Sequence, residues 1–60
     1  MSKLVKGQVY HIDIEFEGER LVDDVKIYFD IMPRSWYVVV YSPKLLSNIE
    51  VRKKDLKDVI

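Results

Sequence analysis

In Tyr10-His11-Ile12-Asp13-Ile14-Glu15-Phe16 the side chains alternate strictly between apolar and polar, which makes this segment the clearest indication of the fold. A period of two is typical of a β-strand with one buried face. The aromatic and isoleucine side chains are predicted to face the core. His11, Asp13 and Glu15 are predicted to form an acidic outer face.

A second alternation follows it along the chain. The side chains predicted to face inward are Val25, Ile27, Phe29 and Ile31, and those predicted to face outward are Lys26, Tyr28 and Asp30. Apolar residues between Leu21 and Met32 also recur at helical spacing, so a helix is the alternative. The density of β-branched and aromatic residues favours the strand.

Charge predicts how these two strands pair. A four-residue loop would place Asp13 opposite Asp24, and like charges directly opposite destabilise a sheet. A longer loop, residues 17–24, instead pairs Glu15 with Lys26. We therefore expect the longer loop.

Turn residues divide the rest of the chain. Met32-Pro33-Arg34-Ser35 predicts a tight turn. Trp36–Ser42 is predicted as a third strand with Trp36, Val38 and Val40 facing inward. The predicted elements that follow are a helical turn over 43–47, a strand over 49–53, a turn over 54–57 and a terminal strand at 59–60. A helix is the alternative here, because Ser42-Pro43 is a good helix start.

This order of elements resembles an SH3-like small barrel, with a long first loop, a tight central hairpin and a late EVRKKDL turn (residues 50–56) before a final apolar pair. The resemblance implies a mostly β fold, a small five-stranded barrel. The alternative is a three-stranded antiparallel meander with a C-terminal helix. The ALYDY-type and KOW-type motifs of related families are absent from the sequence, so no binding residues are carried over. Sixty residues predict one domain, with residues 1–6 as a flexible N-terminal segment.

Composition argues against several classes of function. The chain has no cysteine and one histidine, so neither a disulfide nor a thiolate or zinc site is expected. We expect no cofactor and no catalytic activity, because no nucleophile, base and acid can be assigned together. The longest apolar run is far shorter than a membrane span. The sequence therefore predicts a cytoplasmic protein without a membrane partner.

Function is predicted from the surface that these strands expose. The outward apolar side chains predicted to bind a partner are Tyr28, Met32, Tyr37, Val39 and Tyr41. Exposed patches of this kind mark interaction sites, so we expect a protein-interaction module that binds another protein or itself as a homodimer. It would act as a regulator or as a phage-type inhibitor of a host protein. The alternative is a nucleic-acid-binding barrel, with phosphate contacts from Arg34, Lys44, Arg52, Lys53, Lys54 and Lys57.

Overall fold

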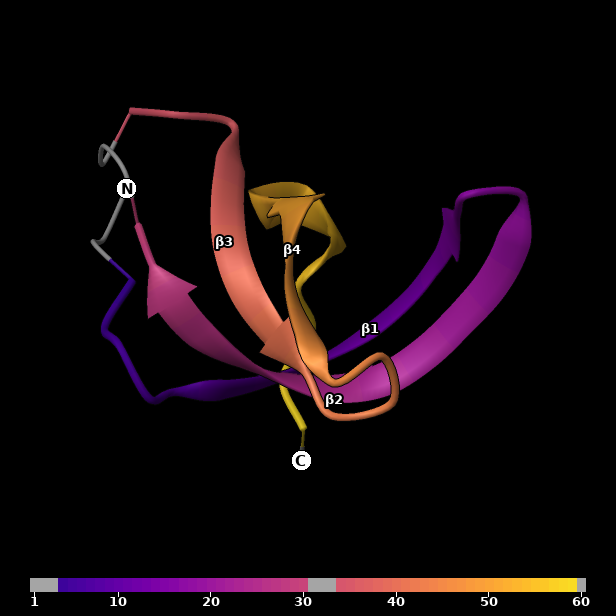
Figure 1. The fold of residues 1–60 in the computed structure, drawn as a ribbon. Helices are drawn as coiled ribbons and strands as arrows, with labels where there is room; N and C mark the ends of the chain where they lie inside the picture. Colours follow the sequence, from indigo (N-terminus) through magenta and orange to yellow (C-terminus); the bar gives the residue numbers. More distant parts are fainter. Residues whose placement is uncertain (1–3, 31–33, 60) are drawn as a thin grey trace.

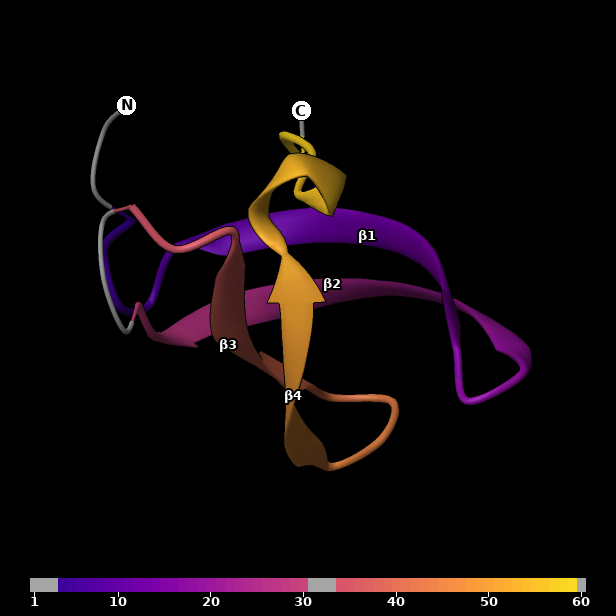
Figure 2. The same ribbon diagram turned by 90° about the horizontal axis from the view of Figure 1, so that it is seen from above.

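The computed structural model describes residues 4–30 and 34–59, which form a four-stranded antiparallel sheet in the order β1-β2-β3-β4 (Figure 1). Its elements are β1 (Val9–Phe16), β2 (Glu19–Phe29), β3 (Tyr37–Ser42), β4 (Ser47–Arg52) and the 3₁₀ turn η1 (Lys53–Asp55). The β1–β2 hairpin is long and strongly curved, and β3 and β4 run across it (Figures 1 and 2). In the described residues, no helix is long and apolar enough to cross a membrane.

The prediction of a mostly β domain is confirmed, but the small five-stranded barrel is not, because the described residues form a four-stranded sheet that is not closed. In place of a terminal strand, the described residues contain one bridge between Lys57 and β1. His11 N donates to Lys57 O at 2.8 Å, and Lys57 N donates to His11 O at 2.9 Å. The alternative C-terminal helix is also wrong, since the described part of residues 43–60 holds only the three-residue η1. Ile60 lies outside the described residues.

The predicted long loop between the first two strands is wrong, because a two-residue turn joins them. Glu17 has a φ of 51° and Gly18 a φ of 83°. Positive φ at both central positions is what a type I′ hairpin turn requires. β2 therefore begins at Glu19. The tight turn also avoids the pairing of like charges, because it places Asp13 opposite Val22 and not opposite Asp24.

A register irregularity in β2 overturns two predicted side-chain directions. Ile27 pairs with Val40, but Phe29 pairs with Val39, so Tyr28 is an extra residue on β2. An inserted residue reverses which face the following side chains occupy. Phe29 was predicted in the core and is instead 55% exposed.

Asp30 lies beyond the same irregularity and was predicted to face outward. Its side chain is instead only 3% exposed, and its Oδ1 lies 2.9 Å from Nζ of Lys53, whose side chain is 10% exposed. Its Oδ2 accepts a hydrogen bond from Leu4 N at 3.4 Å. This buried ion pair joins the end of β2 to η1 and to the N-terminal segment.

The second half of the chain follows the prediction more closely. β3 begins at Tyr37, and Trp36, predicted inward, is 80% exposed. β4 starts two residues earlier than predicted, and a turn over residues 43–46 links it to β3. Of the predicted turn over 32–35, Met32 and Pro33 lie outside the described residues. Ile31 does too.

The core lies between the curved hairpin and the strands that cross it. Its buried apolar side chains are Ile12, Leu21, Val25, Ile27, Val38, Val40, Ile49 and Val51. Partly buried apolar side chains pack against this cluster, Leu4 and Leu56 among them. The inward direction predicted for Val38 and Val40 is confirmed, as is that of Ile12.

Candidate functional site

A concave pocket lies where β3 begins and β4 ends. Tyr37 pairs with Arg52 across the two strands, and Lys53 N donates to Trp36 O at 2.8 Å. This pairing brings the segment before β3 against the segment after β4. The pocket residues are Arg34, Ser35, Trp36, Tyr37, Arg52, Lys53 and Lys54. It therefore combines two aromatic rings with a concentration of positive charge.

The aromatic rings of the pocket are accessible. Trp36 is 80% exposed and Tyr37 is 42% exposed. The backbone beneath them is held, because Tyr37 N donates to Ser35 Oγ at 3.2 Å, in addition to the bond that Trp36 O accepts. Trp36 was missed as a site residue in the sequence because its alternation with Val38 suggested an inward direction. A tryptophan directly after a predicted turn was the available signal.

The structure gathers four of the six predicted nucleic-acid contacts at the pocket. Arg34, Arg52 and Lys54 line the pocket, and within residues 4–30 and 34–59 none of them forms an ion pair. Lys53 also lines it, but its ammonium group is ion-paired with Asp30.

The other two lie elsewhere. Lys44 is in the β3–β4 turn, at the opposite end of that hairpin, and Lys57 is at the bridge to β1. The predicted basic cluster is therefore smaller than the sequence suggested.

The predicted partner-binding residues lie on the outer side of β2 and β3. Tyr41 and Val39 are half-buried and Tyr37 is exposed, and the register places Phe29 directly opposite Val39. Tyr28, at the irregularity, is 48% exposed, with Lys6 Nζ 5.2 Å from its ring centroid. Met32 lies outside the described residues. We call the set Tyr28, Phe29, Tyr37, Val39 and Tyr41 the aromatic face.

Acidic groups border the pocket on its other side. A second hollow shares Tyr37, Arg52 and Lys54 with the first and is bounded by acidic side chains, which are Asp13, Glu15, Glu50 and Asp55. Arg20 Nη2 lies 2.7 Å from Asp13 Oδ2, and the hydrogen bonds from this guanidinium hold the pKa of Asp13 below its ordinary value. Positive and negative surfaces therefore adjoin along one groove.

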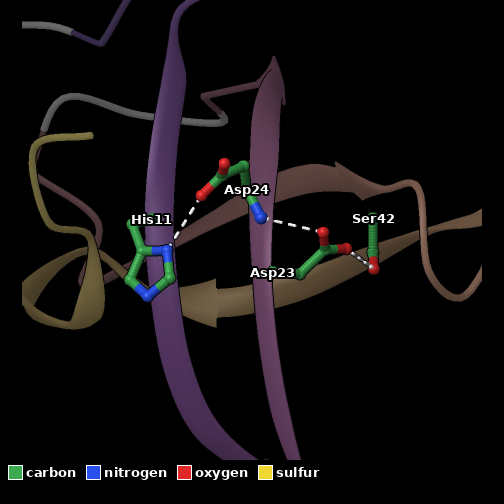
Figure 3. Close-up of polar contacts among 4 residues, drawn as sticks. All are labelled: His11, Asp23, Asp24 and Ser42. Atoms are coloured by element: carbon green, nitrogen blue, oxygen red, sulfur yellow. Dashed lines mark hydrogen bonds and ion pairs between the residues drawn. The ribbon is translucent and has the colours of Figure 1, made fainter. Parts of the chain in front are cut away.

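A serine, a histidine and two aspartates lie close together on β1, β2 and β3 (Figure 3). His11 Nδ1 is 2.8 Å from Asp24 Oδ1, whereas Ser42 Oγ donates to Asp23 Oδ2 at 2.7 Å. The serine hydroxyl is therefore bound to an acid and not to the imidazole, which is not the geometry of a nucleophile with its base. Among the described residues, no group of three or more His, Cys, Asp or Glu side chains is placed to hold a metal ion.

Asp23 is a structural acid with a hydrogen-bonded carboxylate. Burial raises the pKa of Asp23, but hydrogen bonds from Ser42 Oγ and from the backbone N–H groups of Lys44 and Asp24 outweigh it, so the pKa lies below the ordinary value of 3.8. A group with a depressed pKa in the folded state stabilises the fold above the unfolded pKa. That stability is lost as the pH falls through the folded pKa.

Ser42→Ala is therefore expected to raise the pKa of Asp23. The free energy of unfolding should then decrease less on acidification in the variant than in the wild type. The carboxyl carbon of Asp23, followed by NMR over an acid titration, measures the shift. Urea unfolding at neutral and acidic pH measures the linked stability. Ser47→Ala, at the exposed cross-strand neighbour of Ser42, is the control. An Asp23 pKa that stays the same in Ser42→Ala would contradict the assignment.

Comparisons with protein-family models, with curated proteins and with solved structures found no match to this chain.

Proposed function

We propose that the protein is a non-enzymatic protein-interaction module that binds through the aromatic face. The observation that carries the proposal is the position of Phe29, which is 55% exposed directly opposite Val39 on the outer side of the sheet. The solvated face of an antiparallel sheet normally carries polar side chains. Tyrosine and phenylalanine are enriched at protein interfaces.

The first partner to test is a second copy of the chain. A 60-residue domain buries a smaller fraction of its surface on folding than a larger domain does, and it is only marginally stable alone. Eight buried apolar side chains form the core of the described residues. Pairing two aromatic faces would remove further apolar surface from water and so add stability. The same face would let the module occupy a surface of another protein, as a regulator or an inhibitor does.

Phe29→Ala is expected to weaken self-association by about 1–2 kcal/mol, or more if Phe29 is a hot spot. The physical reason is the loss of an exposed aromatic ring directly opposite Val39 in the face. Sedimentation velocity over a range of protein concentrations measures the dimer, and circular dichroism checks that the sheet is intact.

Leu46→Ala is the matched control for this experiment. Leu46 is 77% exposed in the β3–β4 turn, so its truncation removes a similar amount of exposed apolar surface away from the aromatic face. It should leave the dimer unchanged. A wild-type protein that remains monomeric up to its solubility limit would refute pairing through this face, and so would an equal loss of association in both variants.

A further inference from the structure

We propose that the pocket around Trp36 is a binding site for single-stranded nucleic acid. In this site the indole of Trp36 stacks on an unpaired base, and Arg34, Arg52 and Lys54 contact the phosphates on either side of it. The site lies at the end of the β3–β4 hairpin. The observations that support this site differ from those that support binding through the aromatic face. The site does not depend on self-association.

The first observation is the exposure of Trp36. A large apolar ring that is 80% exposed is costly in water unless something covers it. The carbonyl of Trp36 is bonded to Lys53 N, so the backbone carrying the ring is attached to the end of β4. An aromatic ring on a held backbone is a stacking platform, and every base has a face to stack on it.

The second observation is the chemistry around the ring. Arg34, Arg52 and Lys54 have no ion-pair partner in the described stretches of the chain, although acids are as numerous as bases in the sequence. Guanidinium groups match the geometry of phosphate oxygens. The pocket therefore offers a planar aromatic surface and unpaired positive charge within one hollow, which are the two requirements of single-strand binding.

The third observation explains why a single strand fits better than a duplex. Arg52 and Lys54 also line the second hollow, whose remaining charged side chains include the carboxylates of Asp13, Glu15 and Glu50. These carboxylates would repel the phosphates of a second strand. The bases of a duplex are moreover stacked on one another, and extracting one costs a few kcal/mol. We therefore expect one strand to pass the pocket, with few phosphate contacts.

The binding experiment uses the protein's own fluorescence, because Trp36 is the single tryptophan of the chain. Titration with a short oligothymidylate or oligouridylate should quench its emission. Three phosphate contacts predict a slope of about −2 in a plot of log K against log salt, since each contributes about −0.7 for single strands. Binding should accordingly weaken by about 20-fold between about 50 and 200 mM salt.

Variants identify the residues that contact the strand. The affinity of each variant for a labelled oligothymidylate is measured by fluorescence anisotropy. Trp36→Ala should weaken binding by about 5- to 150-fold, the range equivalent to the loss of one stacked base. Trp36→Phe should retain most of the affinity, because a ring remains. Arg52→Gln and Lys54→Gln should each lower the magnitude of the salt slope by about 0.7.

Two controls separate the pocket from the rest of the surface. Lys44→Gln removes the same charge at the opposite end of the β3–β4 hairpin and should leave both affinity and slope unchanged. Phe29→Ala alters the aromatic face alone and should also leave them unchanged.

The proposal would be overturned by any of three results. The first is that Trp36 emission does not change when an oligonucleotide is added. The second is that Lys44→Gln has as large an effect as Arg52→Gln. The third is that a duplex of the same length, or polyglutamate, binds as well as the oligothymidylate, since polyglutamate offers negative charge but no base.

Discussion

Ile12→Ala is expected to unfold the isolated protein, or nearly so. Ile12 is fully buried at the centre of β1 and belongs to the apolar core. Truncation of a buried isoleucine to alanine costs about 2–5 kcal/mol, because transfer energy is lost and a cavity remains. A domain of this size rarely has more than about 3–5 kcal/mol of stability. Urea unfolding followed by circular dichroism measures the change.

Phe29→Ala is the informative control for this experiment. Both residues carry large apolar side chains and both alternate with polar neighbours, but Phe29 is 55% exposed. Its truncation should change the midpoint of monomer unfolding only slightly. If Phe29→Ala were as destabilising as Ile12→Ala in a monomeric sample, the register irregularity at Tyr28 would not exist in solution.

Lys53→Met is expected to destabilise the protein by about 3–5 kcal/mol, the usual cost of removing one partner from a buried ion pair. The variant keeps the length of the side chain but leaves the carboxylate of Asp30 without its cation. Apart from the Lys53 ammonium at 2.9 Å, Oδ1 of Asp30 has no polar partner in the described residues, so its charge would be left uncompensated. Thermal unfolding at neutral pH measures the loss.

The double variant Asp30→Leu with Lys53→Met tests the reason for that loss. Replacing a buried ion pair with apolar side chains of similar volume is often neutral or stabilising. The double variant should therefore recover most of the stability that Lys53→Met loses. Lys54→Met, at the exposed neighbour in η1, should be close to wild type. If Lys53→Met and Lys54→Met have equal effects, the pair does not stabilise the fold.

The candidate site could be predicted only in part. Exposure of Tyr37 and the grouping of Arg52 with Lys54 follow from strand alternation and from closeness in sequence. Phe29 and Trp36 were predicted inside the core, because an unbroken alternation places them there. Lys53 was predicted to be available, but η1 turns it toward Asp30, a residue 23 positions away in the chain. No local sequence pattern indicates the contact between Lys53 and Asp30.

Hydrophobic alternation in the sequence was enough to predict the mostly β class and the buried faces of β1 and β3, because alternation and burial have the same period in a regular strand. The tight turn at Glu17-Gly18 could also have been predicted from the sequence, since glycine accepts a positive φ without steric cost. The position of the extra residue in β2 could not be predicted from local sequence, because it depends on the pairing of β2 with β3. From that one residue follow the outward Phe29, the inward Asp30 and its ion pair with Lys53. A shift by a single position reverses every side chain after it, and only the partner strand specifies where the shift occurs.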